Sequence, residues 1–383
     1  MRLNHLARDE RGMSIVFVGV SFLAFMSATT LAIDVGMFMT ARSQAQNAAD
    51  AGALAGATAL VFNSYTDRSA GGPAVQGAIN ASRANQVMAA APSVVPADVT
   101  FPNDPSGQPN RVQVQVYRTT ARSNAVPTLI GAIFGVPTVN INAVAVGEAS
   151  PANAETCVKP FTIPDKWKEV QTPPWTPNST FDMYDSKGNP LANPDVYIGP
   201  SDPANYTGYN PIRDKGLEVT LKANNSTKIT ASFYNPWDLP GSVGASDYRN
   251  NIANCNTARF GIGQNMPPEN GNMVGPTAQG TDDLIAKDPN AYWDSGCNCV
   301  KGSAYGVSPR VVVIPVYDPV AFANGAQSGK NITLTVTNYI GVFMEDMKGN
   351  QVYGRITPVL GIYDANAGPA PEGAFPRVIR LVQ

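Results

Sequence analysis

A long apolar run without charges, close to the N-terminus, constrains this chain more than any other feature of its sequence. No residue from Met13 to Ile33 is charged, and more than half of these residues are large and apolar. A helix needs about 20 apolar residues to cross the hydrocarbon core of a bilayer. Because a single segment in lipid can satisfy its backbone hydrogen bonds only as a helix, we expect one transmembrane helix here.

Positive charges flank this run unequally. Arg2, Arg8 and Arg11 precede it, whereas only Arg42 follows closely. The positive-inside rule then predicts a cytoplasmic N-terminus, with the bulk of the chain on the other side of the membrane. A cleaved signal peptide and a buried core helix are the alternatives. The run is longer than the usual apolar region of a signal peptide, about 7–15 residues, and no clean Ala-x-Ala cleavage site follows it, so we favour a retained anchor.

The helical pattern continues beyond the apolar run. The first proline is Pro73, so one helix could extend from Met13 to Leu60, which is about 70 Å at a rise of 1.5 Å per residue. Small residues recur every fourth position and would let another helix or a sheet approach closely. Such packing is expected within the chain's own domain or, alternatively, against a partner helix. The helix-packing candidates are Ala45, Ala49, Gly52, Ala53 and Gly56.

Three blocks of this region form a recognisable pattern. They are Glu10-Arg11-Gly12, Ala32-Ile33-Asp34-Val35-Gly36, and the alanine-rich residues 44–57 with their Gln-Asn-Ala-Ala-Asp-Ala core. The pattern resembles the N-terminal domain of TadG-like proteins, which belong to the Tad (Flp) pilus assembly systems of bacteria. The resemblance extends over roughly the first 150 residues. It implies a bacterial inner-membrane protein with most of its chain in the periplasm and with other pilus-assembly proteins as partners.

One difference from pilins and pseudopilins bears on the expected role. Subunits cut by a prepilin peptidase are cleaved after a glycine and usually carry Glu five residues beyond the cut. Gly12 lies where that glycine would lie, but the fifth residue after it is Phe17. A carboxylate in lipid is costly unless a neighbouring subunit pairs with it, so its absence favours a static anchor over a filament subunit.

The chain is expected to be α+β and to divide into three regions. Residues 1–60 would form the cytoplasmic tail, the transmembrane helix and a stalk helix. Residues 61–150 would form a small α+β neck, in which a helix at 75–90 lies across an antiparallel sheet. The alternating residues 111–117 and 138–146 predict its strands, with a short helix at 126–130 between them.

Proline becomes frequent at Pro151, where the third region, residues 151–383, begins. Short alternating or β-branched segments separated by turn residues predict a C-terminal β-rich domain. The expected strands are residues 217–221, 228–234, 310–316, 332–339 and 352–362.

The chain has four cysteines, Cys157, Cys255, Cys297 and Cys299, all in this third region. In an exported domain they predict two disulfides. In an extended chain, Cys297 and Cys299 would have Cα atoms near the upper limit for a bridge. We therefore expect Cys157 and Cys255 each to bond one member of this close pair. A zinc site with four cysteine ligands and four free thiols are the alternatives.

Several kinds of chemistry are disfavoured by composition. The one histidine, His5, precedes the apolar run, so the outer region lacks the imidazole of Ser–His–Asp and Cys–His nucleophiles and of His-ligated zinc sites. A net charge of −2 gives no indication of nucleic-acid binding. Residues 185–189, Asp-Ser-Lys-Gly-Asn, lack further carboxylates at alternate positions and so predict a turn and not a cation loop. We expect no enzyme activity, no cofactor, no metal and no small-molecule substrate.

Three functions remain open. The first is a membrane-anchored, non-catalytic scaffold of Tad (Flp) pilus assembly. The second is an envelope adhesin or glycan-binding protein on a TadG-like anchor, which exposed aromatic side chains would favour. The third is a hydrolase, which would need a pocket with convergent carboxylates. The tryptophans that discriminate between the first two are Trp167, Trp175, Trp237 and Trp293.

Overall fold

A computed structural model describes residues 11–64, 66–223, 228–242, 244–327 and 334–382. The chain forms two compact units. Unit 1 comprises Met1–Leu60, Thr66–Glu148 and Arg380–Gln383, and unit 2 comprises Val61–Tyr65 and Ala149–Ile379. The expected division kept the stalk helix and the neck as separate regions, 1–60 and 61–150. The structure groups both in unit 1, because the neck packs along the helix.

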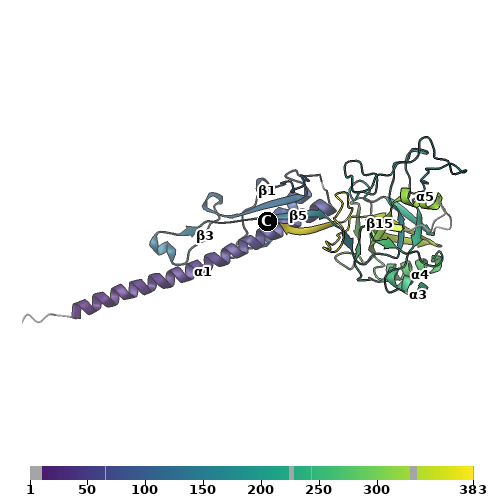
Figure 1. Ribbon diagram of the computed structural model, residues 1–383. Coiled ribbons are helices and arrows are strands. Elements are labelled where there is room, and N and C mark those ends of the chain that lie inside the picture. Colours follow the sequence, from purple (N-terminus) through teal and green to yellow (C-terminus); the bar gives the residue numbers. More distant parts are fainter. Residues whose placement is uncertain (1–10, 65, 224–227, 243, 328–333, 383) are drawn as a thin grey trace, which may run out of the picture. The chain divides into compact units, whose positions relative to one another are not determined.

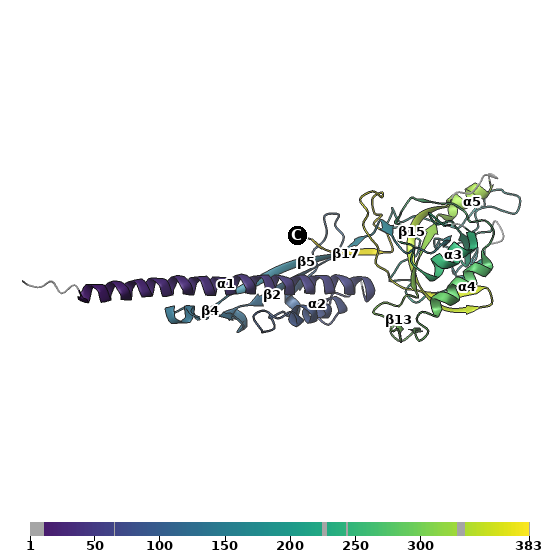
Figure 2. The same ribbon diagram turned by 90° about the horizontal axis from the view of Figure 1, so that it is seen from below.

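Helix α1 runs without interruption over 52 residues, from Arg11 to Phe62. Its length agrees with the absence of proline and the high alanine content, since alanine is the strongest helix former. Its N-terminal part extends away from the other elements of unit 1, whereas the sheet and α2 (Pro73–Ala84) lie along its C-terminal part (Figure 1 and Figure 2). Helix α2 ends before the expected residue 90, because Asn85 leaves the helical conformation, with φ of −88° and ψ of 94°.

A sheet that lies mostly in unit 1 has four strands in the order β1-β2-β5-β17. Strands β2 and β5 are antiparallel, with Arg111 opposite Glu148 and Arg118 opposite Ile141. The alternation expected along β2 is confirmed, because Val112, Val114 and Val116 are fully buried. The strands are β1 (Val99–Thr100), β2 (Arg111–Arg118), β5 (Ile141–Pro151) and β17 (Arg377–Val382).

A short hairpin joins β2 to β5. Its stem is a two-residue ladder between β3 (Val126–Pro127) and β4 (Thr138–Val139), and its tip contains the 3₁₀ helix η3 (Gly131–Phe134). We name residues 126–139 the finger. The short helix expected at 126–130 is wrong: those residues begin the ladder, and the helical turn starts only at Gly131.

Unit 2 is built around a β-barrel. The hydrogen-bonded order is β11-β15-β14-β7-β9-β8-β16, and an additional β15–β16 pairing closes six of these strands on themselves. The β7–β14 and β8–β9 pairs are parallel, and the other pairs are antiparallel. The strands are β7 (Phe161–Pro164), β8 (Glu218–Ala223), β9 (Phe233–Pro236), β11 (Asn265–Met266), β14 (Val311–Tyr317), β15 (Leu334–Lys348) and β16 (Gln351–Ile356).

Apolar side chains from alternate barrel positions, such as Ile314, Val342 and Val352, form the main core of unit 2 together with Tyr248 and Leu284 of the covering helices. The helices are α3 (Gly244–Ala253), α4 (Val274–Ile285) and α5 (Pro319–Gln327). Smaller elements are η1 (Pro96–Asp98), η2 (Thr120–Arg122), β6 (Ala154–Glu155) with β10 (Phe260–Gly261), and β12 (Tyr292–Asp294) with β13 (Cys299–Lys301).

All five strands expected in the third region overlap observed strands, but their bounds differ. Residues 228–234 are the weakest case, because only Phe233 and Tyr234 belong to β9. The expected strand at 352–362 ends at Ile356. Of the expected strand at 332–339, Ile332 and Thr333 lie outside the described residues. An α+β fold with a long apolar helix and a β-rich region is confirmed.

Candidate functional site

The first part of α1 exposes an apolar surface on all sides. Every residue from Ser14 to Thr29 is exposed, with Phe17 at 67%, Phe25 at 77% and Ile15 at 74%. Burying one such side chain away from water contributes about 1.5–3 kcal/mol, and nothing in the described part of unit 1 covers these. Among the described residues, α1 alone is long and apolar enough to cross a membrane, judged by length and composition.

The second part of α1 buries one face within unit 1. Ala45 is 1% exposed, and Ala49 and Ala53 are fully buried. A Cβ atom at Gly52 would overlap the Ser82 hydroxyl of α2 and lie 3.0 Å from the Ala78 carbonyl oxygen. The face continues at Gly56, whose added Cβ would lie 2.7 Å from the Val112 side chain of β2.

The five helix-packing candidates therefore lie on a face that α2 and the sheet occupy. Ala45 joins Ala41, Val87, Val126 and Ile141 in a small apolar cluster of unit 1. At these positions α1 packs against α2 and the sheet of its own unit. The five residues are buried by these contacts, which leaves no surface at them for a partner helix.

The two parts of α1 meet at Asp34, whose carboxylate is 5% exposed. It accepts hydrogen bonds from the backbone N–H groups of Leu129 at 3.0 Å and Gly131 at 2.7 Å, with a longer one from Ile130 at 3.4 Å. Asp34 thus caps η3 and holds the finger against α1. The sequence analysis assigned no role to Asp34, although it lies in one of the blocks that carry the family resemblance.

All four cysteines form disulfides, but the expected pairing is wrong. Cys157 bonds Cys255 with a Cα–Cα distance of 4.3 Å, and Cys297 bonds Cys299 at 5.2 Å. The expectation assumed an extended chain between Cys297 and Cys299. Instead they lie in the β12–β13 hairpin, where Asn298 has a φ of 49° and brings the two Cα atoms within bridging range.

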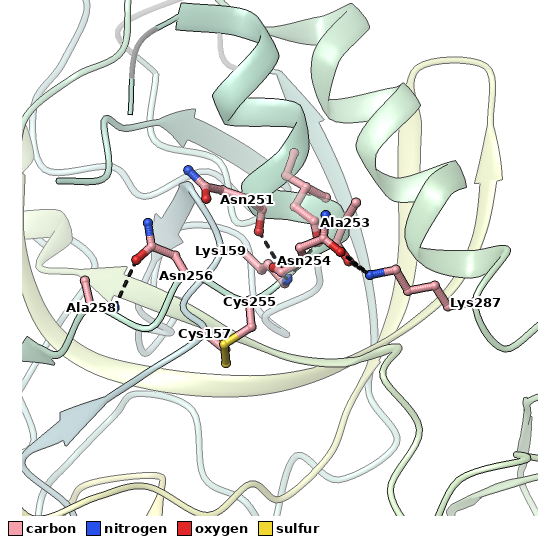
Figure 3. Close-up of a disulfide and its surroundings, with 10 residues drawn as sticks. Cys157, Lys159, Asn251, Ala253, Asn254, Cys255, Asn256, Ala258 and Lys287 are labelled. Carbon is pink, nitrogen blue, oxygen red and sulfur yellow. Dashed lines mark hydrogen bonds between the residues drawn. A yellow bond between two sulfur atoms is a disulfide. The ribbon is translucent and has the colours of Figure 1, made fainter. Parts of the chain in front are cut away.

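A buried lysine lies beside the Cys157–Cys255 bond (Figure 3). The Lys159 ammonium donates to the carbonyl oxygens of Asn251 at 3.3 Å, Ile252 at 2.7 Å and Asn254 at 2.9 Å. These carbonyls lie at the C-terminal end of α3, where a cation is favourable. Burial, and secondarily the charge of Lys287, lowers the pKa of Lys159 to about 7. Lys159 therefore ties α3 to the strand region that carries Cys157.

A second buried titratable group, Asp165, is enclosed by tyrosines. It accepts hydrogen bonds from the hydroxyls of Tyr197 at 3.0 Å and Tyr206 at 2.8 Å and from the N–H of Tyr209 at 3.0 Å. Burial raises the pKa of Asp165 to about 6 although these bonds act in the other direction. Because its side chain is fully buried, Asp165 organises the loops around it and cannot meet a substrate.

Unit 2 has a surface hollow of about 520 Å³ whose lining includes two carboxylates, Asp182 and Asp185. Burial raises the pKa of Asp182, helped by the charges of Asp195 and Glu169. The Asp185 carboxylate is instead held by the N–H groups of Lys187 and Asn189, as expected for a turn. Among the described residues, no group of three or more His, Cys, Asp or Glu side chains could hold a metal ion.

The tryptophans belong to the interior of unit 2. Trp167 and Trp237 are 1% exposed and Trp293 is 8% exposed. Trp175 is half-buried and packs edge-on against Trp167 and Tyr209. Their positions fit a structural role and do not offer the aromatic platform that a glycan-binding surface would need.

Comparison with known proteins bears on α1 alone. The family model for Flp pilus-assembly TadE/G-like proteins matches residues 12–59, which begin one residue after the start of α1 and end three before its last residue. The curated proteins contain no match to the chain, and neither do the solved structures. Residues 12–59 are therefore similar to the Flp pilus-assembly TadE/G-like family, as the resemblance to TadG-like proteins predicted.

Proposed function

We propose that this protein is a membrane-anchored, non-catalytic scaffold of Tad (Flp) pilus assembly in the bacterial inner membrane. The first part of α1 would span the bilayer with the N-terminus in the cytoplasm, and both units would lie in the periplasm. The partners would be other pilus-assembly proteins.

The observation that carries the proposal is the change in surroundings along a single helix. From Ser14 to Thr29 the helix exposes apolar side chains on all sides, whereas from Ala41 onward it buries one face of small residues. From Ser14 to Asp34 the helix has about 20 residues, which is the length of a bilayer span. The TadE/G-like match covers both parts, which supports an anchor joined rigidly to a periplasmic neck.

Two further features support a periplasmic location and a binding role. Two disulfides suit an oxidising compartment such as the periplasm. The four tryptophans are buried or half-buried, so the alternative of a glycan-binding adhesin gains no support from them.

The test uses a strain that lacks the chromosomal gene and carries plasmid-borne variants. Replacing residues 1–33 with a cleavable signal peptide should export both units but abolish pili, because the released protein no longer holds its partners at the membrane. Replacing the same residues with an unrelated transmembrane helix of equal length should restore pili. Full piliation with the released protein would overturn the proposal.

Two measurements complete the test. The intact mass of membrane-extracted protein should correspond to the full chain, whereas loss of the residues up to Gly12 would indicate a processed, filament-type subunit. Asp182→Asn removes the accessible acid with a raised pKa. It should leave piliation unchanged, and loss of pili in this variant with normal protein levels would favour a catalytic role.

A further inference from the structure

The finger carries an unusual concentration of exposed apolar side chains. Residues 125–139 contain no charged residue. Four large apolar side chains at its tip are exposed: Leu129 at 63%, Ile133 at 80%, Phe134 at 61% and Val136 at 50%. Single exposed apolar residues are common on proteins, but a contiguous group of this kind marks an interaction surface.

The tip is held in a fixed form and is not a loose loop. Thr128 bonds across the finger, its N–H to the Pro137 carbonyl at 3.0 Å and its hydroxyl to the Val136 carbonyl at 2.6 Å. The N–H of Val136 donates to the Gly131 carbonyl oxygen at 3.0 Å. Together with the bonds to Asp34, these contacts give partners to most backbone N–H groups of the tip, while its apolar side chains are exposed.

The finger points along α1 toward the apolar part of the helix. At its stem, Val126 packs with Ala41 and Ala45, whereas nearer the tip Gly131 bonds Asp34, about two turns closer to the N-terminus of α1. Figure 1 shows β3 and Figure 2 shows β4 alongside α1, on the side of the sheet nearer the N-terminus of α1.

The position of Asp34 sets the depth of the tip. From Ser14 to Asp34 the helix rises about 30 Å, which is the thickness of the hydrocarbon core. If Ser14 lies near one boundary of the core, Asp34 and the bonded finger tip lie at the other. Ile33 and Val35 of α1 are exposed at the same level, by 40% and 39%, so the apolar surface continues from the span to the tip.

We propose that the finger tip inserts into the boundary between headgroups and acyl chains of the bilayer that α1 spans, as a second membrane contact. The occupant of this surface is lipid, because the tip continues an apolar span and residues 125–139 carry no charge. Asp34 can lie at this depth because three backbone N–H groups replace its water. The inference rests on the proposed anchor.

The test measures the depth of a nitroxide label in the full-length protein, reconstituted in vesicles of phosphatidylethanolamine and phosphatidylglycerol. Since all four native cysteines are in disulfides, a single introduced cysteine can be labelled selectively. The test position is Ile133→Cys. The reference for lipid is Phe22→Cys in the anchor. The reference for water is Asn80→Cys, on the exposed face of α2. Helix α2 packs against α1 at Gly52, which lies about 27 Å beyond Asp34 along the helix.

Collision rates with oxygen, which concentrates in lipid, and with a water-soluble nickel chelate give the depth. We expect the oxygen-to-nickel ratio at Ile133 to be several-fold higher than at Asn80 and lower than at Phe22. A ratio equal to that of Asn80 overturns the inference while leaving the anchor intact. A water-like ratio at Phe22 overturns the anchor itself.

Low collision with both reagents at Ile133 would mean that protein covers the tip, and this too overturns the inference. Leu129→Cys provides a second label position at the same level. Its side chain is exposed, and the substitution leaves its backbone bond to Asp34 in place.

Discussion

Asp34 and Gly131 are joined by a hydrogen bond of 2.7 Å although they are 97 residues apart in the chain. The bond connects the point where α1 changes from an exposed to a buried helix with the point where the finger begins its helical turn. The close contact also explains why residue 131 is a glycine, because an added Cβ atom there would lie only 3.1 Å from the Asp34 carboxylate and from the Thr128 side chain. The contact fixes the finger at one level of the helix.

Removing the carboxylate should release the finger. Asp34→Ala leaves three backbone donors without their acceptor, and bonds to a charged group contribute about 1.5–3 kcal/mol each. We expect hydrogen exchange at the amides of Leu129 and Gly131 to accelerate by about tenfold or more. The measurement is exchange followed by mass spectrometry on the full-length protein in vesicles.

Asp34→Asn is the matched control, because it keeps one acceptor oxygen and should accelerate exchange less than Asp34→Ala. Unchanged exchange in the alanine variant would show that the two-residue stem and the Thr128 bonds hold the finger without Asp34.

Two glycines of α1 should respond oppositely to the same substitution. At Gly36 no atom lies within 4 Å of an added Cβ, so Gly36→Ala should stabilise the helix by about 0.5–1 kcal/mol. At Gly52 the methyl group would collide with Ser82 and press on the Ala78 carbonyl, so Gly52→Ala should destabilise unit 1 by about 1–3 kcal/mol. Thermal unfolding in detergent compares them, and equal stabilisation by both would contradict the packing described for α2.

The long helix and the neck could be predicted because their signals are local. An unbroken helical pattern without proline gave α1 to within two residues at each end, and strict alternation gave β2. The closure of the barrel could not be predicted, because it depends on β15 pairing with both β14 and β16 over different parts of its length. The addition of β17 to the sheet of unit 1 is another pairing between distant segments with no local signal.

The site was only partly predictable for the same reason. The stripe of small residues identified the buried face of α1, but not that α2 and β2 fill it. The uncharged residues 125–139 were a usable signal for the finger tip. The role of Asp34 and the carbonyl cluster around Lys159 depend on partners about 95 residues away, which a single sequence does not indicate.

The two disulfides should differ sharply in their effect on stability. Cys157–Cys255 joins residues 98 positions apart, so the Cys157→Ser, Cys255→Ser double variant should lose about 3–5 kcal/mol. Cys297–Cys299 closes a loop of separation 2, and its double serine variant should lose only about 1–2 kcal/mol. Urea unfolding without reductant measures both.

A non-reduced tryptic digest tests the pairing itself. It should yield Cys297 and Cys299 bonded within one peptide, and a peptide linked to Cys157 through either of them would contradict the structure.

Lys159 should make the stability of unit 2 depend on pH in the alkaline range. Its pKa is about 7 in the folded protein against the usual 10.5, because burial disfavours the charged form. From about pH 7 to about pH 10.5 the unfolded chain therefore binds more protons at this site than the folded one, so the free energy of unfolding rises with pH there and levels off below pH 7. The slope from this one group is at most about 1.4 kcal/mol per pH unit.

Lys159→Met removes the titrating group and should flatten the rise, as measured by urea unfolding at several pH values with the disulfides intact. Lys348→Met, at a side chain that is 70% exposed, is the control and should retain the rise of the unmodified protein. If Lys159→Met kept the same slope, the ammonium would be better hydrated than its three carbonyl contacts imply.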